Sequence, residues 1–299
     1  MTAQKDDTAR HVPVLPREVL DWLRPCSGGS YADGTLGLGG HAELILRQSG
    51  PDGRLFGFEW DSQAAARAQE RLAEFGGRFQ LIPSSYAEMA ARIRAQETGP
   101  LDGILLDLGV SSLQFDSPER GFSFQSDAPL DMRMSRSLPV TAAELLNNLN
   151  QDELADIFFH YGEERQARRI ARFIAEARLV QPVTTTRQLA EIVRQAVPVK
   201  YQPKKIHPAT LVFQALRIAV NRELDNLAQA LADAPQLLAS GGRLCVITFH
   251  SLEDRMVKQS FAANPALRVL TKKPVPPGAE EIAANPRSRS AKLRVAEKI

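Results

Sequence analysis

The sequence predicts an α/β fold in which a doubly wound, mainly parallel sheet carries a smaller, all-helical insertion. Short apolar runs alternate with amphipathic stretches through the first hundred residues, which is the pattern of successive βαβ units. Strand-like runs then disappear through a long central segment and return near the end of the chain. A glycine-rich turn follows the first apolar run, as it does in nucleotide-binding sheets.

Four apolar runs in the first third of the chain predict parallel strands. The fourth, LDGILLDL, is apolar almost throughout, as expected for a strand buried on both faces of a sheet. The stretches between the runs are amphipathic and predict helices. The strands are predicted at Ser30–Asp33, Arg54–Glu59, Phe79–Ile82 and Leu101–Leu108. The helices are predicted at Gly39–Gln48, Ser62–Phe75 and Tyr86–Ala95.

The central segment predicts a long ordered loop followed by helices. Residues 113–140 are rich in Gly, Pro, Ser and Asp, whereas residues 141–205 show helical patterns and no strand. Glu163–Leu179 is the clearest amphipathic helix. Two helix starts have the capping-box pattern, in which two side chains satisfy free N–H groups reciprocally. These pairs are Thr141 with Glu144 and Thr185 with Gln188.

The sheet is expected to resume after Pro208. One long helix is predicted to run to about Leu238, and Gly241-Gly242 then precedes RLCVITFH, a fifth buried strand at residues 243–250. Beyond it we expect an irregular segment at 274–289 and an edge strand at 291–296. The expected domains are residues 1–112 for the first part of the sheet domain, 113–207 for the inserted helical domain and 208–299 for the second part of the sheet domain.

Composition limits the classes of protein that this chain fits. It has no apolar run long enough to span a membrane, and residues 1–14 lack the apolar core of a signal peptide. Cys26 and Cys245 lie far apart and in no metal-ligand spacing, so we expect no metal site. A reduced, cytoplasmic setting is therefore expected, with no membrane partner.

The net charge is only +2, but basic residues are unevenly distributed. Lys and Arg outnumber Asp and Glu by ten to four in residues 161–205 and by eight to three in residues 264–299. Basic segments on a nearly neutral chain fit an anionic macromolecule such as nucleic acid. The alternative is that these charges are ordinary solvated helix faces.

The glycine-rich turn predicts a cofactor site. Asp33 ends the first strand, and Gly37, Gly39 and Gly40 follow before a helix whose first N–H groups are free. Glu59 ends the second strand, where a carboxylate can accept hydrogen bonds from both ribose hydroxyls of an adenosine. This layout fits both a dinucleotide and S-adenosylmethionine.

Acidic residues at the strand ends favour S-adenosylmethionine over NAD. Gly37-Leu-Gly-Gly-His-Ala42 formally matches the dinucleotide fingerprint, so an NAD-dependent enzyme is the alternative. However, Asp33 would repel a pyrophosphate and would attract a sulfonium or ammonium group. Asp107, at the end of the fourth strand, adds a second carboxylate at the same edge of the sheet.

Six blocks of the chain, in order, carry a resemblance to a known family. They are HVPVLPREVL, ADGTLGLGGHAELIL, LLDLGVSSLQFDSPERGFSFQSDAPLDMRM, YGEERQARRIARFI, HPATLVFQALRIAVNREL and GGRLCVITFHSLEDRMVK. From about His11 to Glu297, the chain resembles the bacterial 16S rRNA (cytosine-N4)-methyltransferase family. The resemblance implies a Rossmann-like, class I methyltransferase sheet with an inserted helical domain that recognises the substrate. It also implies methyl transfer from S-adenosylmethionine to N4 of a cytidine in the decoding region of the small ribosomal subunit.

The resemblance assigns cofactor residues to positions in this sequence. Besides Asp33 and Gly37 from the turn, they are Gly39, Gly40, His41, Glu59, Tyr86, Asp107 and Gln114. Glu59 stands where the family commonly has Asp, and Tyr86 where it often has Phe. Leu113 replaces the Pro that usually precedes Gln114.

The catalytic group is less clearly marked. Many amino-methyltransferases carry Asp, Asn or Ser, two prolines and an aromatic residue after the fourth strand, but here the segment is DLGVSS. We therefore expect Asp107, or a backbone carbonyl of residues 108–110, to accept a hydrogen bond from the cytosine amine.

Several residues are candidates for substrate contacts. Phe122 and Phe124 are expected either to stack on a splayed cytosine or to pack inside the loop. His250 follows the fifth strand and is expected to contact substrate or to be fixed by structural hydrogen bonds. The remaining candidates are Asp131 and Arg133 in the loop, and Lys204, Lys205, Arg168, Arg169 and Arg172 for phosphate contacts. Neutralising Lys204 and Lys205 is expected to weaken rRNA binding and to spare cofactor binding.

The expected partner is 16S rRNA, within the small ribosomal subunit. Two other classes remain open at this point, an NAD-dependent enzyme and a noncatalytic RNA-binding module that kept the fold. The presence of Asp33, Glu59 and Asp107 weighs against a lost active site. A homodimer is also left open by the sequence.

Overall fold

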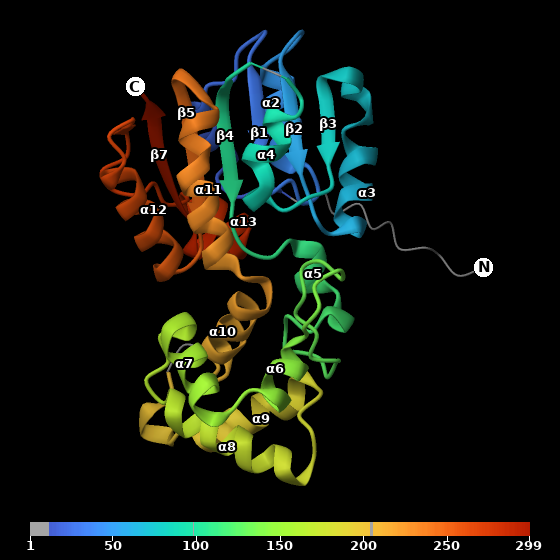
Figure 1. Ribbon diagram of the computed structural model, residues 1–299, viewed down its shortest axis with the longest axis vertical. Coiled ribbons are helices and arrows are strands. Elements are labelled where there is room, and N and C mark those ends of the chain that lie inside the picture. The colour runs from blue at the N-terminus through green and yellow to red at the C-terminus, as the bar shows by residue number, and fades with distance from the viewer. Residues whose placement is uncertain (1–11, 98, 204–205) are drawn as a thin grey trace, which may run out of the picture. The chain divides into compact units, whose positions relative to one another are not determined.

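A computed structural model describes residues 12–97, 99–203 and 206–299, which form two compact units. Of the described residues, 12–109 and 226–299 belong to the sheet unit, and those within 110–225 belong to the helical unit (Figure 1). In the described ranges, no helix is both long and apolar enough to cross a membrane.

The sheet unit contains a seven-stranded sheet in the order β3-β2-β1-β4-β5-β7-β6 among the described residues. The strands are β1 (Ser30–Asp33), β2 (Arg54–Phe58), β3 (Phe79–Ile82), β4 (Leu101–Asp107), β5 (Leu238–Thr248), β6 (Leu267–Val269) and β7 (Lys292–Lys298). The first five are parallel, and β7 is antiparallel to both β5 and β6. This is the Rossmann order with an antiparallel strand inserted before the last position, so the predicted class I methyltransferase fold is confirmed.

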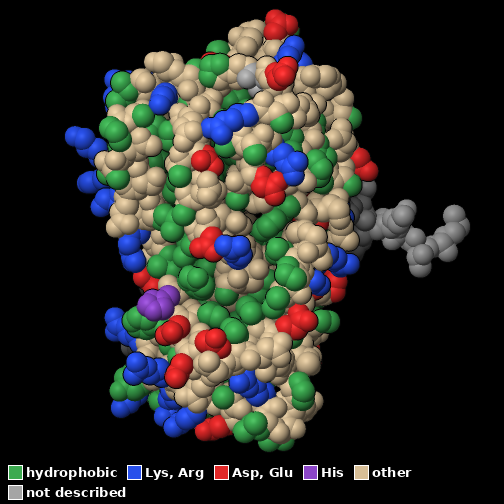
Figure 2. Space-filling view, in the orientation of Figure 1, with side chains coloured by type: hydrophobic (Ala, Val, Ile, Leu, Met, Phe, Trp, Pro, Cys, Tyr) green, Lys and Arg blue, Asp and Glu red, His purple; other side chains and the backbone are tan. Residues whose placement is uncertain are grey.

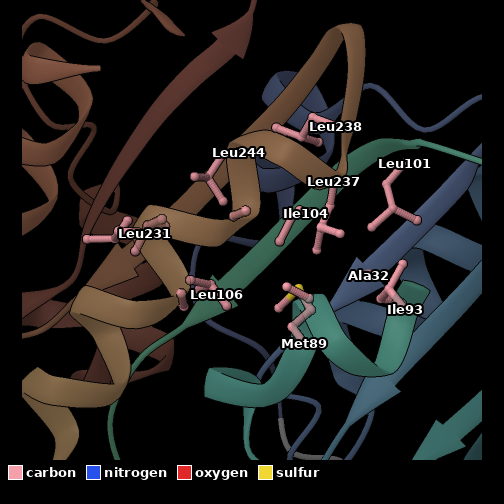
Figure 3. Packing of buried hydrophobic residues seen from close by; sticks show 14 of the residues in the cluster. Ala32, Met89, Ile93, Leu101, Ile104, Leu106, Leu231, Leu237, Leu238 and Leu244 are labelled. Atoms are coloured by element: carbon pink, nitrogen blue, oxygen red, sulfur yellow. The ribbon is translucent and has the colours of Figure 1, made fainter. Parts of the chain in front are cut away.

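Apolar side chains of each central strand alternate between two cores, one on each face of the sheet. On β4, Ile104 and Leu106 point to one core and Leu105 to the other. Figure 3 shows the first core, where Met89 and Leu231 from two helices meet these strand residues. The helices on that face are α4 (Met89–Arg94), α11 (Glu223–Leu237) and α12 (Ser251–Ala263). Those on the other face are α1 (Pro16–Leu23), α2 (Gly40–Gln48) and α3 (Ser62–Arg71).

The C-terminal part of the sheet unit differs from three predictions. Residues 292–298 form β7, which lies between β5 and β6, so it is an inner strand and the edge belongs to β6. Residues 274–289 are not wholly irregular, because they include α13 (Ala279–Ala284) and the start of a 3₁₀ turn. The fifth strand begins earlier than predicted, at Leu238, and ends at Thr248, with an irregular register near Gly241.

The helical unit is built on α7 (Gln151–Gly162), against which α8 (Ala167–Val180) and α10 (Thr210–Asn221) pack. Both predicted capping boxes are present, at the starts of α6 (Ala142–Asn148) and α9 (Thr186–Ala196). The unit also contains the short helix α5 (Ser112–Asp116). The predicted helix at Glu163–Leu179 begins later than expected, because Glu163 is left-handed, with φ of 52°, and ends α7.

The single long helix predicted after Pro208 is two helices, α10 and α11. Arg222 separates them with a left-handed backbone, at φ of 52°. The helical unit therefore extends beyond the expected junction at 207–208, because α10 packs on α6 and α7. Short 3₁₀ turns complete the chain at η1 (Ala73–Arg78), η2 (Tyr86–Glu88), η3 (Pro118–Arg120), η4 (Val199–Tyr201) and η5 (Pro286–Ser290).

Candidate active site

The predicted cofactor turn joins β1 to α2, and two of its glycines lie close to neighbouring side chains. Gly39 is left-handed, with φ of 78°, and a Cβ there would lie 3.2 Å from Cδ1 of Leu72. A Cβ on Gly40 would lie 3.2 Å from Cδ of Pro13. Side chains of other segments thus pack closely against the turn. Because its glycines carry no side chain, a ligand can approach the backbone of the turn closely.

Pro13 packs against Gly40, and the segment that contains it is bonded to the C-terminal part of the sheet unit. The N–H of Leu15 donates a hydrogen bond of 2.7 Å to Oε1 of Glu281 in α13. Leu15 itself is fully buried and left-handed, with φ of 52°. The segment at residues 13–15 is therefore fixed by a residue distant in sequence.

Glu59 follows β2 and is held by two backbone N–H groups. Gly37 donates to Oε2 at 2.9 Å, and Asp61 donates to Oε1 at 2.8 Å. Burial raises the pKa of Glu59 to about 7, although these hydrogen bonds oppose the shift. Trp60 adds a further backbone hydrogen bond, so the carboxylate is fixed in direction and remains an acceptor for a ligand.

Asp33, at the end of β1, is buried beside two other ionisable side chains, those of His41 and Asp107. Burial raises the pKa of its carboxyl group to about 6. The neighbouring His41 opposes this rise, whereas the negative charge of Asp107 adds to it. Because a cation close to Asp33 would relieve both the burial cost and the repulsion, the site favours a positively charged ligand.

Asp107 and His41 face each other at the end of β4, with Oδ2 lying 3.6 Å from Nε2. Within the residues that the structure describes, Asp107 Oδ1 and both ring nitrogens of His41 are buried without a hydrogen-bond partner. Unpaired buried polar atoms are costly, and they are common where a ligand completes the site. The residues present therefore fit a small polar cofactor at this edge of the sheet.

Tyr86 lies beside the turn, in η2. A Cβ added to Gly34 would lie 3.0 Å from Cβ of Tyr86 and 2.4 Å from Cδ2 of Leu106. The aromatic side chain is partly buried against the core that Figure 3 shows. The sheet unit thus brings together the predicted residues of the turn with Glu59, Tyr86 and Asp107.

Gln114 belongs to the helical unit and is bound within it. Its side-chain Oε1 accepts a hydrogen bond from the N–H of Ser111, and its Nε2 donates to the carbonyl oxygen of Met134 at 3.2 Å. The bond from Ser111 and the reciprocal one, from the N–H of Gln114 to Oγ of Ser111 at 3.3 Å, form a capping box at the start of α5. Cofactor binding by Gln114 remains a prediction.

The two candidate phenylalanines pack inside the helical unit. Phe122 is buried, and the ring of Phe124 lies 4.8 Å from both the ring of Phe213 and that of His207. These contacts account for both side chains as packing residues, which was one of the two expectations. Stacking on a cytosine remains a prediction.

Asp131 and Arg133 form an ion pair that organises the loop. Arg133 Nε lies 2.7 Å from Asp131 Oδ1, and Arg133 Nη1 donates to the carbonyl oxygen of Leu138 at 2.8 Å. Burial alone would raise the pKa of Asp131, but the hydrogen bonds from Arg133 outweigh it and lower the pKa.

His250 caps α12 and does not lie within β5. The N–H of Glu253 donates to His250 Nδ1 at 3.4 Å, and the N–H of Phe249 donates to Glu253 Oε2 at 2.8 Å. These contacts correspond to the expected structural role, and a substrate contact remains a prediction. The predicted phosphate contacts Lys204 and Lys205 lie outside the described residues.

Sequence reasoning missed two polar residues that organise these regions. Thr35 bonds to both Asp33 and the backbone of Asp107. Asn221, at the end of α10, bonds to the backbone of Met132 and Met134 in the loop. The positions of a Thr two residues after Asp33 and an Asn at a helix end were the only signals, and neither reveals a partner distant in sequence.

Comparisons with known proteins identify the family of the chain. The model of the MraW methylase family matches residues 8–299. A protein of Geobacter sulfurreducens, named ribosomal RNA small subunit methyltransferase H, is 52% identical over 98% of this chain and 100% of its own length. Proteins of the same name are 50% identical in Desulfotalea psychrophila, over 97% of this chain and 98% of that one, and 53% identical in a Cyanothece strain, over 97% and 95%. The chain belongs to the MraW methylase family.

Proposed function

We propose that this protein transfers a methyl group from S-adenosylmethionine to the exocyclic N4 of a cytidine in the decoding region of 16S rRNA, within the small ribosomal subunit. The family is one of methylases, which favours this function over that of an NAD-dependent enzyme. The relatives named as small-subunit rRNA methyltransferases support rRNA as the substrate. The choice of cytosine N4 rests on the resemblance described above.

One observation carries the proposal for the cofactor. Asp33, Glu59 and Asp107 lie at the carboxyl ends of β1, β2 and β4, which are neighbours in the order β2-β1-β4. Ligands of doubly wound sheets bind at this edge, where the strand order reverses. Three carboxyl groups suit a cation with a ribose and oppose a pyrophosphate.

Each of these residues has a distinct part in the proposed site. Glu59 would accept hydrogen bonds from the ribose hydroxyls through a carboxylate already fixed by Gly37 and Asp61. Asp33 and Asp107 would balance the positive charges of the ligand. When bound there, S-adenosylmethionine supplies an electrophilic methyl group.

Asp107 is the proposed acceptor for the cytosine amine. The lone pair of this amine is delocalised into the ring, so a hydrogen bond from N4 to a carboxylate would favour its attack on the methyl group and the later loss of a proton. Oδ1 of Asp107 is buried without a partner among the described residues, so it is available to accept that bond. The nearby His41 keeps the second oxygen beside a group that can hold positive charge.

The helical unit supplies a basic surface for the RNA backbone. Arg168, Arg169 and Arg172 are exposed on α8, and Figure 2 shows Lys and Arg side chains on the face of this unit that is turned to the viewer. Contacts of this kind position RNA without reading its sequence. An rRNA substrate would place the enzyme in the cytoplasm.

The test is to incubate the protein with radiolabelled S-adenosylmethionine and small subunits from cells that lack the enzyme, and then to map the label. The proposal expects one labelled cytidine in the decoding region, methylated on N4. Asp107→Asn should keep the subunit bound and lower the rate of transfer by roughly a hundredfold, as expected for loss of an acid–base group. Label on another base or on protein would overturn the assignment, and absence of any label would favour a noncatalytic RNA-binding module.

A further inference from the structure

The hydroxyl group of Thr35 lies between the ends of β1 and β4. The N–H of Asp107 donates a hydrogen bond of 2.6 Å to Oγ1 of Thr35. Oγ1 in turn lies 3.4 Å from Oδ1 of Asp33, which also accepts the N–H of Thr35 at 3.0 Å. Because a backbone N–H can only donate, Oγ1 is the acceptor toward Asp107 and its own hydrogen is free to donate to Asp33.

This hydroxyl takes the place of a backbone acceptor in the sheet. The β1–β4 ladder pairs Asp33 with Leu105, and the N–H of Gly34 donates to the carbonyl oxygen of Leu105 at 2.9 Å. The chain then leaves the ladder to form the glycine turn, so the next N–H on this side of β4, that of Asp107, meets Thr35 Oγ1 instead of a backbone carbonyl. On the other side of β4 the ladder continues normally, since Leu108 donates to the carbonyl oxygen of Ile247 at 3.0 Å.

We propose that Thr35 is a positioning residue that fixes the carboxyl groups of Asp33 and Asp107 relative to each other at the cofactor site. The inference rests on the proposed function, because it concerns how that site holds its cationic cofactor and the reacting amine. One small side chain connects the turn, the end of β1 and the end of β4. Its methyl group is not needed for this connection, whereas its hydroxyl group is.

The direction of the hydrogen bonds has a consequence for Asp33. The carboxyl group of Asp33 faces the side chains of His41 and Asp107, and it receives hydrogen bonds from the N–H and the hydroxyl of Thr35. The Thr35 contacts lower the pKa of Asp33 against the opposing effect of burial. Removal of the hydroxyl should therefore raise that pKa further and leave the N–H of Asp107 without an acceptor.

The decisive comparison uses Thr35→Val, which keeps the shape and removes the hydroxyl, and Thr35→Ser, which keeps the hydroxyl. The matched control is Thr271→Val, because Thr271 Oγ1 also accepts a buried backbone N–H, that of Val295 at 2.8 Å, between other parts of the sheet unit. Binding of S-adenosylmethionine is measured by calorimetry from pH 5 to 8, and methyl transfer to small subunits is measured under saturating cofactor.

Thr35→Val is expected to lower kcat roughly tenfold, since misplacement of a reacting group weakens catalysis steeply. The rise in cofactor binding that follows ionisation of Asp33 should also shift to higher pH by roughly half a pH unit, because Asp33 then ionises at higher pH. Thr35→Ser should restore both quantities, and Thr271→Val should leave both unchanged even if it lowers Tm.

Several results would overturn the inference: no change in Thr35→Val, an equal loss in Thr35→Ser, or the same loss in Thr271→Val. Failure of the proposed function has a different signature. If the wild-type protein binds S-adenosylmethionine but labels no rRNA, the proposed substrate is wrong, and the pH shift of binding still decides the role of Thr35. If it binds no S-adenosylmethionine, both are overturned.

Discussion

The backbone N–H of Gly37 donates a 2.9 Å hydrogen bond to Oε2 of Glu59, which connects the glycine turn to the end of the neighbouring strand. The second oxygen of Glu59 accepts the N–H of Asp61. Both oxygens are therefore acceptors in the folded protein, and the side chain cannot be replaced by an amide without placing an NH₂ group against a backbone donor.

Glu59→Gln is expected to weaken binding of S-adenosylmethionine by roughly 10- to 100-fold, because hydrogen bonds to a charged acceptor are lost and one backbone N–H meets a donor. Glu59→Asp keeps the charge, and it should weaken binding much less. Calorimetry with S-adenosylmethionine checks both variants. Equal affinity of Glu59→Gln and the wild type would show that this carboxylate does not hold the ribose.

The pKa of Glu59 predicts opposite pH trends for stability and for cofactor binding. Because the folded-state pKa is about 7 and the ordinary value is 4.5, the unfolded chain ionises first. The contribution of Glu59 to stability is fully present below pH 4.5 and is lost as the pH rises through about 7. Cofactor affinity should instead increase over the same range, because the ribose binds the ionised form.

Measurement of Tm for the ligand-free protein between pH 4.5 and 8 checks this trend. Glu59→Gln should flatten the decline, although the part due to Asp33, whose pKa is raised from 3.8 to about 6, should remain. A wild-type Tm that rises over this range along with cofactor affinity would contradict the prediction.

Asn221→Ala should loosen the loop of the helical unit. Asn221 accepts the N–H of Met134 at 2.7 Å and donates to the carbonyl oxygen of Met132 at 2.8 Å, in a buried position where Met132 is left-handed. Loss of these bonds should destabilise this unit by about 2–4 kcal/mol and speed hydrogen exchange at the N–H of Met134.

Asn150→Ala is the matched control for Asn221. Asn150 caps α7 at an exposed position, where its Oδ1 accepts the N–H of Glu153 at 2.9 Å. Loss of this cap should lower the free energy of unfolding by about 1 kcal/mol and leave hydrogen exchange at the N–H of Met134 unchanged. If both variants speed that exchange equally, Asn221 acts only through the general stability of the unit.

Arg168→Gln should weaken binding of small-subunit rRNA and leave cofactor binding unchanged. Each lost phosphate contact should reduce the salt slope of the binding constant by about 0.9 or less. Arg194→Gln is the control, because Arg194 lies 2.7 Å from Glu191 and its charge is already balanced. An equal loss for Arg194→Gln would mean that net charge alone governs binding.

Local signals in the sequence were sufficient for the elements that build the cofactor turn. Apolar runs and flanking glycines predict the strand at Ser30–Asp33 and the buried strand at Leu101–Leu108, observed at residues 101–107, without reference to other segments. Capping boxes at Thr141 and Thr185 were equally local. For the same reason the carboxylates at the strand ends could be expected to share one edge of the sheet.

Features that depend on distant partners could not be predicted in this way. The break at Arg222 carries no Gly or Pro, and the inner position of β7 depends on which strand it pairs with. The role of Thr35 depends on the register of β1 against β4, which sets where the ladder stops. Likewise, the raised pKa of Glu59 follows from burial, which the spacing of residues does not show.

The bond from Leu15 to Glu281 joins residues that are 266 positions apart in the chain. Pro13 lies against Gly40 of the glycine turn, and two residues later Leu15 is bonded to Glu281 in α13. A chain truncated before Ala279 would contain Asp33, Glu59 and Asp107 but would lack Glu281, which holds the segment that packs against Gly40. Because Glu281 comes so late in the chain, any copy that ends before it lacks the acceptor for the N–H of Leu15.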